Sequence, residues 1–500
     1  MAFNSGKFLV FFPCAVIVYF LLPKKAKSIW LLACSYYFYM AWNPAYILLL
    51  IFSTLVTYLS GIVLDDLKKK GAAIRKRKLV LLLCTAANMG VLVYFKYTGF
   101  LAEMIDRVLA LTLHKGPVLS TVIPDIILPV GISFFTFQAV SYTIDVYRGD
   151  IEAEHNIIRY ALFVSFFPQL VAGPIERSRN LLVQVRNIGR EKLWDYEGII
   201  RGLILMLWGF FMKVVIADRL SIITDPVFND QSAYGASMRI MAVSCFSIQI
   251  YCDFAGYSTI AIGAAQVMGI HLMENFNTPF LARNVKDFWN RWHISMSSWF
   301  RDYLYIPLGG SRCSKRRYYF NLFITFLASG LWHGAAAKYL VWGGLNGLLQ
   351  ILNRVWKPYR ARLLGALRLR EDGPVRFLET VISFCTFTLT LVVFRANSLK
   401  LALEYFVHTI TRPDYRQFVT ERTYRSLVSD RDMIINAAAV VILLIVGLIR
   451  KNRGKTLDVF LMEKSYPVRA AVMMFLLFFI ILFGRYGEDV YTQPFVYFQF

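Results

Sequence analysis

The sequence predicts an all-α protein that crosses a membrane several times. Of its 500 residues, 57% are hydrophobic, and the mean hydropathy of +0.50 is higher than a soluble protein of this size carries. The apolar residues form long blocks of the length that transmembrane helices need. A membrane β-barrel would instead show short segments of alternating hydrophobicity. Because we see no long linker and no internal repeat, we expect one integral membrane domain over residues 1–500.

The first part of the chain contains four apolar blocks separated by basic loops. The first block lacks a basic leading segment and a small-residue cleavage site, so we interpret it as a membrane helix rather than a signal peptide. Basic runs follow the first and third blocks, and basic loops of this kind stay in the cytoplasm. This places the N-terminus outside and explains the net charge of +23 without a nucleic-acid partner. The four blocks are residues 8–22, 29–42, 45–64 and 79–95.

Helix breakers interrupt the next apolar stretch. Pro124, Pro129 and Gly131 indicate a broken or re-entrant helix, since Pro and Gly at membrane depth are tolerated where the backbone is buried in protein. We expect its second half to continue as a helix to about Val146. The following apolar blocks are 160–171, which stops at the Ala-Gly-Pro of 172–174, then 199–217 and 240–269.

The block 240–269 contains an acidic residue, Asp253, four positions before Tyr257. This spacing places both side chains on one face of a helix. An acidic group at membrane depth is costly and is normally paired or functional. We favour a structural hydrogen bond to a neighbouring helix over a direct chemical role.

Residues 287–305 have the pattern of an amphipathic helix. On a helical wheel the stripe of Trp289, Trp292, Met296, Trp299 and Tyr303 lies opposite most of the charged side chains. A charged, Trp-rich helix of this kind is expected to lie in the membrane interface rather than to span the bilayer. His293 falls at the edge of the stripe, where we expect apolar and wet surroundings to meet.

The stretch 321–347 contains one histidine, His333, and no acidic residue. Small residues surround it, and the steps Gly330–Gly334 and Gly343–Gly347 allow a neighbouring helix backbone to come close. Two interpretations follow from these residues. His333 is either a buried histidine bonded to a backbone carbonyl or a catalytic base in a tightly packed bundle.

The last third of the chain contains three further apolar blocks, at 377–394, 433–449 and 472–483. Basic runs at 312–317, 354–370 and 450–455 mark cytoplasmic loops. Counting sides places segment 397–432 and the C-terminal tail, residues 485–500, outside. The seven cysteines have no paired or metal-ligand spacing, so we expect neither disulfides nor a metal site.

Several long motifs resemble a known family. The chain is similar to bacterial members of the membrane-bound O-acyltransferase superfamily, in the branch that O-acetylates alginate and other cell-surface glycans. The motifs appear in the family's order within a core of about residues 120–350, and the terminal VYFQF is also similar to chain ends in this branch. They are PVGISFFTFQAVSYTIDVYRG (129–149), FPQLVAGPIERS (167–178), YCDFAGYSTIAIG (251–263), ENFNTPF (274–280), DFWNRWHISMSSWFRDYLYIPLGGSR (287–312) and SGLWHGAAAKYLVWGGLNG (329–347).

The resemblance implies a fold and a set of site residues. The fold is a ring of about 11–13 transmembrane, re-entrant and interfacial helices around a central tunnel. His333, in the WHG motif, matches the catalytic histidine of the superfamily, and His293, in RWH, matches the second histidine of this branch. Our further candidates for supporting or tunnel-lining roles are Asp253, Tyr257, Arg291, Trp292, Trp332 and Asn346.

Three positions depart from the pattern. Many relatives carry Ser where this chain has Ala255, an acid where it has Thr259 and a histidine where it has Asn346. These differences bear on which acceptor is used more than on the reaction.

The reaction implied is acetyl transfer from a cytoplasmic thioester to a cell-surface glycan, directly or through a partner acetyltransferase. We expect acetyl-CoA as donor substrate, no bound cofactor, and a location in the bacterial cytoplasmic membrane. His333 would act as general base, while His293 would orient the donor, stabilise the oxyanion or relay a proton. Tyr497, in the tail, is a candidate acyl relay or partner contact, although an aromatic membrane anchor is the simpler interpretation.

Three other functions fit parts of the pattern. One is transfer of D-alanine to teichoic acid. Another is a transporter or flippase, which would predict corresponding half-helices in two repeats. A third is a non-enzymatic scaffold for a cell-envelope complex.

Overall fold

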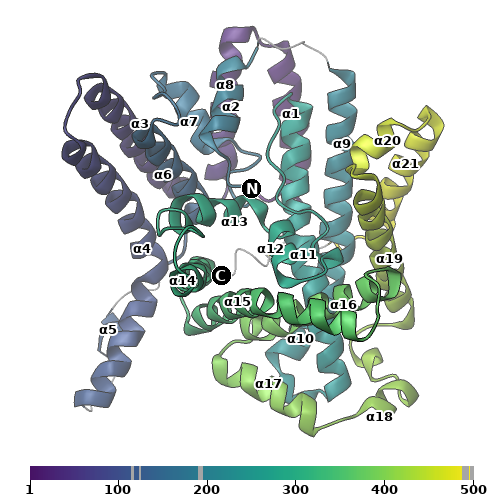
Figure 1. The fold of residues 1–500 in the computed structure, drawn as a ribbon. Helices are drawn as coiled ribbons and strands as arrows, with labels where there is room; N and C mark the ends of the chain where they lie inside the picture. The colour runs from purple at the N-terminus through teal and green to yellow at the C-terminus, as the bar shows by residue number, and fades with distance from the viewer. Residues whose placement is uncertain (114–117, 123–125, 190–194, 487–494, 496–500) are drawn as a thin grey trace. The chain divides into compact units, whose positions relative to one another are not determined.

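The computed structural model describes residues 1–113, 118–122, 126–189, 195–486 and 495, and every regular element among them is helical (Figure 1). This confirms the all-α prediction. Seven helices of the described chain are long and apolar enough to cross a membrane, so the protein is a multi-pass membrane protein. These spans are Pro44–Lys69, Ile74–Thr112, Tyr196–Asn229, Ala236–Val267, Gly373–Arg395, Asp430–Arg453 and Tyr466–Phe483.

Contacts divide the chain into two compact units. Unit 1 consists of Met1–Gly202 and Ala261–Met273, and unit 2 of Leu203–Ile260 and Glu274–Phe500. Two helices, α9 (Tyr196–Phe210) and α11 (Ala236–Val267), contribute residues to both. The single domain, the ring of helices and the central tunnel stay predictions.

Unit 1 is built from the N-terminal helices. Its further elements are α1 (Gly6–Leu21), α2 (Lys24–Met40), η1 (Pro44–Tyr46), α3 (Ile47–Lys69), α4 (Ile74–Leu113), α5 (Leu119–Val122), α6 (Ile132–Arg148), α7 (Ile157–Ser165), the π-turn η2 (Ser178–Leu182) and α8 (Val183–Asn187).

The start of α6 shows how a glycine ends the broken segment. Gly131 has a φ of 78°, a backbone conformation that side chains other than hydrogen rarely allow. A Cβ at this position would also lie 2.9 Å from the carbonyl oxygen of Leu170. The helix then runs to Arg148, which confirms the predicted helical second half. Pro124 lies outside the described residues.

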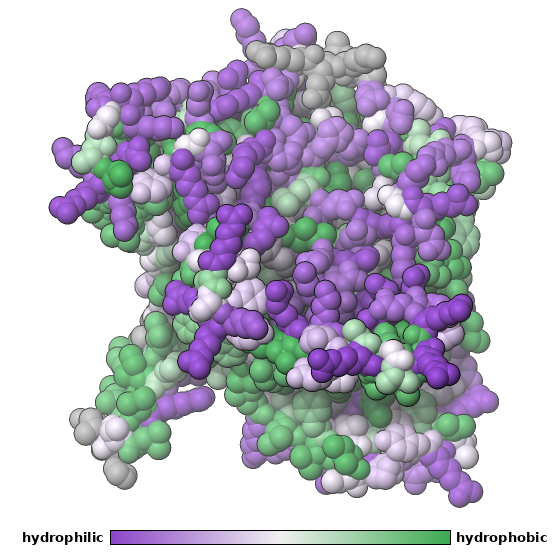
Figure 2. Space-filling model, in the orientation of Figure 1, coloured by the Kyte–Doolittle hydropathy of each residue, from purple (hydrophilic) through white to green (hydrophobic). Residues whose placement is uncertain are grey.

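Helix α4 shows how the basic and apolar patterns are separated in space. Lys76 and Lys78, in its first turns, are exposed, and so are many apolar residues further along, such as Met104, Val108 and Leu111. Figure 2 shows hydrophobic residues gathered over the lower part of α4 and over α5. Exposed apolar side chains along a span indicate a surface in contact with lipid.

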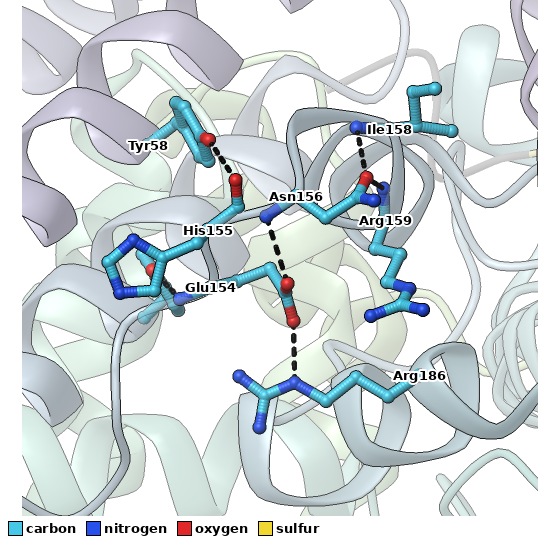
Figure 3. A network of polar contacts seen from close by, with 8 residues as sticks. Tyr58, Glu154, His155, Asn156, Ile158, Arg159 and Arg186 are labelled. Carbon is cyan, nitrogen blue, oxygen red and sulfur yellow. Dashed lines mark hydrogen bonds and ion pairs between the residues drawn. The ribbon is translucent and has the colours of Figure 1, made fainter.

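The loop before α7 is held by a polar network (Figure 3). Glu154 accepts a hydrogen bond from Arg186 Nε at 2.5 Å, and Tyr58 donates to the carbonyl oxygen of His155 at 2.7 Å. The side chain of Asn156 accepts from the backbone N–H groups of Ile158 and Arg159, which caps the start of α7.

The predicted helix over 160–171 is correct only to Ser165. The residues that follow form turns, although they stay buried. Side chains satisfy the backbone groups that leave the helix, since Ser35 Oγ accepts from Phe167 N–H and Gln138 Nε2 donates to the carbonyl of Phe163. Buried polar partners of this kind allow an apolar run to leave helical geometry.

Unit 2 contains the remaining helices. They are the π-turn η3 (Phe211–Ala217), α10 (Asp218–Asn229), η4 (Gln231–Ala233), η5 (Pro279–Leu281), α12 (Val285–Arg291), α13 (Ile294–Phe300), the π-turn η6 (Arg301–Tyr305), α14 (Lys315–His333), α15 (Ala337–Ala366), α16 (Gly373–Arg395), α17 (Leu399–Thr411), α18 (Tyr415–Thr420), η7 (Thr423–Ser426), α19 (Asp430–Arg453), α20 (Leu457–Met462) and α21 (Tyr466–Phe483).

Helices α14 and α15 form a hairpin whose two backbones nearly touch. A Cβ at Gly330 would lie 2.3 Å from the carbonyl oxygen of Tyr339 and 2.9 Å from the Cα of Gly343. This confirms that the small residues allow close approach. The partner of Gly330 is Gly343 across the hairpin, so one glycine of each step lies at the close contact, whereas Gly334 faces the ring of Tyr339 and Gly347 faces Phe323 and Phe326.

The single amphipathic helix predicted over 287–305 is wrong. The segment is broken at Trp292–His293, and His293 has φ 44° and ψ 55°, in the left-handed region. The break turns the aromatic stripe into the protein, where Trp289, Trp292 and Trp299 are all buried. They pack against other aromatic rings. The ring centroid of Phe387, for example, lies 5.0 Å from that of Trp292. A helical wheel assumes one continuous helix and therefore misses this arrangement.

Candidate active site

His293 is held at the junction of α12 and α13. Its side chain is completely buried rather than at a boundary with water. Ring atom Nδ1 lies 2.9 Å from Oδ1 of Asn275, in the segment that leads from α11 to η5. The imidazole packs edge-on against Phe254 of α11, with the ring centroids 4.6 Å apart. A non-glycine residue in the left-handed region is costly and is often found at functional sites.

His333 is the last residue of α14 and is 5% exposed. Aromatic rings surround it on several sides. The centroid of Trp342, on α15, lies 5.1 Å from its ring, and that of Phe394, on α16, lies 5.7 Å away. The helix ends immediately after it because the chain becomes extended at Gly334, where a Cβ would clash with the ring of Tyr339.

The two histidines lie beside the same indole ring. Trp332 is 5.1 Å from the His333 ring and 5.8 Å from the His293 ring, measured between centroids. The junction of α12 and α13 and the end of α14 thus bring two imidazoles and Trp332 into one buried cluster. His293 lies outside the seven candidate spans. Burial lowers the pKa of its imidazole well below the ordinary value of about 6.5, and a positive charge on His333 would lower it further. Both effects favour a neutral imidazole.

Asp253 forms part of a buried ion cluster, which we define as Lys213, Asp218 and Asp253. Lys213 Nζ, on η3, lies 2.5 Å from Asp253 Oδ1 and 2.8 Å from Asp218 Oδ1. All three side chains are at most 6% exposed. Because buried charges require compensation, the cluster accounts for an acid inside α11.

Tyr257 lies on the same side of α11 as Asp253, as its spacing predicts. Its ring contacts Phe495 edge-on at 4.6 Å between centroids, and Lys213 Nζ lies 4.3 Å from the centre of the same Phe495 ring. The neighbouring face of α11 carries Phe254 and Ser258, which contact His293 and Asn275. The ion cluster and the histidines therefore lie on adjacent faces of one helix.

The other predicted residues contact neighbouring segments or their own helix, and their supporting or tunnel-lining role stays a prediction. Arg291 donates to Asp287 at 2.7 Å and to the carbonyl of Asn277 at 3.4 Å, which joins α12 to the segment before η5. Trp292 packs against Phe276 and Phe387. Asn346 is buried and donates to the carbonyl of Trp342 in its own helix. Tyr497 lies outside the described residues.

Three polar residues of the ion cluster and the histidine site, Lys213, Asp218 and Asn275, were not among the predicted site residues. Lys213 and Asp253 each stood inside a predicted span, and a cation and an acid in neighbouring spans are a signal that they pair. Asn275 lies within the motif ENFNTPF. Sequence spacing alone does not reveal that it faces His293, because the two residues meet only through the break between α12 and α13.

Comparison with known proteins identifies the family. The model of the MBOAT, membrane-bound O-acyltransferase family matches residues 31–368. The chain belongs to this family. It is 37% identical to a probable alginate O-acetylase of Pseudomonas aeruginosa over 80% of this chain and 73% of that protein. It is 33% identical to a peptidoglycan O-acetyltransferase of Helicobacter pylori over 81% of this chain and 79% of that protein.

A more limited similarity extends to a third kind of relative. A teichoic acid D-alanyltransferase of Bacillus subtilis is 31% identical over 50% of this chain and 66% of that protein. Family membership makes the chain a membrane-embedded acyltransferase. We therefore do not retain the transporter and the non-enzymatic scaffold as alternatives.

Proposed function

We propose that the protein moves an acetyl group from acetyl-CoA, bound from the cytoplasm, to a hydroxyl group outside the membrane. The acceptor is a cell-surface polysaccharide or a partner acetyltransferase that passes the group on. The observation that carries this proposal is the pair of buried imidazoles that both lie beside the ring of Trp332. Relatives named as O-acetylases of alginate and peptidoglycan support it.

In the proposed step, the acceptor oxygen attacks the carbonyl carbon of the thioester. His333 removes the hydroxyl proton as the new C–O bond forms. The tetrahedral intermediate then collapses, the C–S bond breaks, and the proton passes to the departing CoA sulfur. A positioned general base of this kind contributes about 10²–10⁴-fold to the rate.

The surroundings of the two histidines suit this role. Both rings are packed among aromatic side chains and nearly or completely buried. Burial disfavours the imidazolium ion and so favours a neutral imidazole that can accept a proton. Scarce water also limits hydrolysis of the thioester, which would waste the donor.

D-Alanine transfer to teichoic acid is the second candidate. The acetylating relatives and the D-alanyltransferases differ in the share of this chain that they match. The acetylating relatives cover 80–81% of it, whereas the D-alanyltransferases cover 50–53%. We therefore favour acetyl transfer.

We further propose a cytoplasmic-membrane location with both termini outside. This follows from the distribution of basic loops between the apolar blocks.

The central test replaces each histidine with alanine. Bacterial membranes containing each variant are supplied with acetyl-CoA labelled in the acetyl group, and label reaching surface polysaccharide is measured. We expect His333→Ala to lose about 10²–10⁴-fold in activity while inserting normally, and His293→Ala to lose a comparable amount. The matched control is His155→Ala, because that side chain is 64% exposed. Full acetyl transfer by His333→Ala would refute the assignment.

A further inference from the structure

Asn275 lies against the junction that carries His293. The backbone N–H of Ile294 donates to the carbonyl oxygen of Asn275 at 2.9 Å, and Asn277 N–H donates to the carbonyl of Arg291 at 2.9 Å. Two segments distant in sequence are thereby joined on both sides of His293. The Asn275 side chain is 1% exposed, so its amide has fixed partners instead of bulk water.

The partners of the Asn275 amide determine which end is the oxygen. The end that faces His293 also lies 3.3 Å from the backbone nitrogen of Ser295 and 2.9 Å from its Oγ. A backbone N–H can only donate, so the atom that faces it must be an acceptor. The other end donates to Ser258 Oγ at 3.0 Å, which suits an NH₂ group. The hydrogen-bond network therefore assigns Oδ1 to the side of His293.

This orientation has a consequence for the imidazole. An amide oxygen only accepts, so His293 Nδ1 must carry the proton in their 2.9 Å contact. A neutral imidazole has one N–H, and that N–H is engaged with Asn275. Nε2 of neutral His293 then presents a lone pair, and the ring has no second N–H to offer.

We propose that Asn275 is a positioning residue that holds neutral His293 as the Nδ1–H tautomer, so that His293 acts as a proton acceptor at Nε2. This rests on the proposed acetyl transfer, and it selects among the roles open to His293. A neutral ring with its only N–H bound to Asn275 cannot donate to an oxyanion. His293 Nε2 therefore acts as an acceptor. Either it takes the proton from His333 and passes it to the departing CoA sulfur, or it accepts a hydrogen bond from the acceptor hydroxyl and orients it.

The choice of an amide rather than a carboxylate fits the same role. A carboxylate beside Nδ1 would favour the imidazolium ion, which has no lone pair. Around His293, the rings of Phe254, Phe276 and Trp332 do not ionise. Among the described residues, the titratable group that acts on His293 is His333, whose charge disfavours a second charge.

Two variants of Asn275 test the proposal, with Asn277→Ala as a control from the same segment. Asn275→Ala removes the acceptor at Nδ1, and we expect a loss of about ten- to a hundredfold in acetyl transfer, as is typical for residues that orient a histidine. Asn275→Asp keeps the shape and adds a charge. It should raise the pKa of His293 and move the acid limb of the pH–rate profile to higher pH.

Nitrogen NMR of the wild-type protein with labelled histidine provides a readout that a purely structural role would not affect. We expect His293 to show a protonated Nδ1 and an unprotonated Nε2. A protonated Nε2, or an unchanged pH–rate profile in a folded Asn275→Asp protein, would overturn the proposal. The spectrum of the wild-type protein decides the tautomer even if Asn275→Ala fails to fold.

The outcomes separate this proposal from the proposed function. If His293→Ala retains full activity, the catalytic role of His293 fails whatever its tautomer. If His293→Ala is inactive while Asn275→Ala has normal activity and pH dependence, the positioning role of Asn275 fails alone.

Discussion

The geometry of the buried ion cluster allows a quantitative prediction about the stability of the protein. Lys213 is the one cation of the cluster and bridges two carboxylates, at 2.5 Å from Asp253 and 2.8 Å from Asp218. Lys213→Met leaves two buried anions without their cation. Asp253→Asn instead leaves one cation paired with one anion, in a side chain of the same shape. The two substitutions therefore have very different electrostatic consequences.

The size of the difference follows from the geometry. Both carboxylate oxygens contact the same ammonium group, so they lie within about 5 Å of each other, and their repulsion at an effective dielectric constant of about 20 is about 3 kcal/mol. Removing one partner of a buried ion pair typically destabilises a protein by ~3–5 kcal/mol. We expect Lys213→Met to lose stability in this range and Asp253→Asn to lose clearly less.

Thermal unfolding in detergent, followed by the fluorescence of the 10 tryptophans, measures the effect. The matched control is Lys70→Met, because Lys70 pairs with Asp66 at the surface, where the two side chains are 70% and 53% exposed. Surface pairs contribute little, so this variant should unfold at the wild-type temperature. The reasoning would be refuted if Lys213→Met unfolded at the wild-type temperature. It would also be refuted if Asp253→Asn unfolded at a lower temperature than Lys213→Met.

Two further predictions concern packing and pH. Gly330→Ala places a Cβ 2.3 Å from the carbonyl oxygen of Tyr339 and should lower the free energy of unfolding by about 1–3 kcal/mol. Gly344→Ala meets only ordinary contacts at 3.6 Å or more, so it should be neutral or stabilising. Equal unfolding temperatures for the two variants would contradict this prediction. Burial raises the pKa of the Glu176 carboxyl from 4.5 to about 7. The folded state therefore binds this proton more tightly than the unfolded state does. The free energy of unfolding should fall by up to about 3 kcal/mol as the pH rises from about 4.5 to above 7. Glu176→Gln should remove this pH dependence, which is measured as the difference between the unfolding temperatures at about pH 5 and about pH 8. If the variant keeps the wild-type difference, the effect belongs to another group.

Much of the secondary structure could be predicted because lipid imposes a simple rule. A chain in lipid must satisfy its backbone hydrogen bonds internally, so long apolar blocks become helices. The blocks at 377–394 and 433–449 accordingly lie within α16 and α19. The prediction was wrong at 287–305, where one residue in the left-handed region divides the helix, and at 166–171, where buried polar side chains replace helical hydrogen bonds.

The candidate site could be predicted only in part. His333 and Asp253 stood out because an ionisable group in an apolar block is costly and needs a reason. The resemblance to a family supplied the role of His293 and the reaction. Asn275 could not be selected in this way, because an asparagine in a short polar segment carries no comparable signal.

The sequence by itself determined that this protein is a helical membrane protein with one histidine, His333, inside an apolar stretch, because hydropathy and charge act locally along the chain. Only the tertiary structure decided which groups meet. It brought Asn275 to His293, both histidines to Trp332, and Lys213 to Asp218 and Asp253. The physical reason is that buried polar groups must find partners wherever the fold provides them, and those partners come from segments that no local pattern connects.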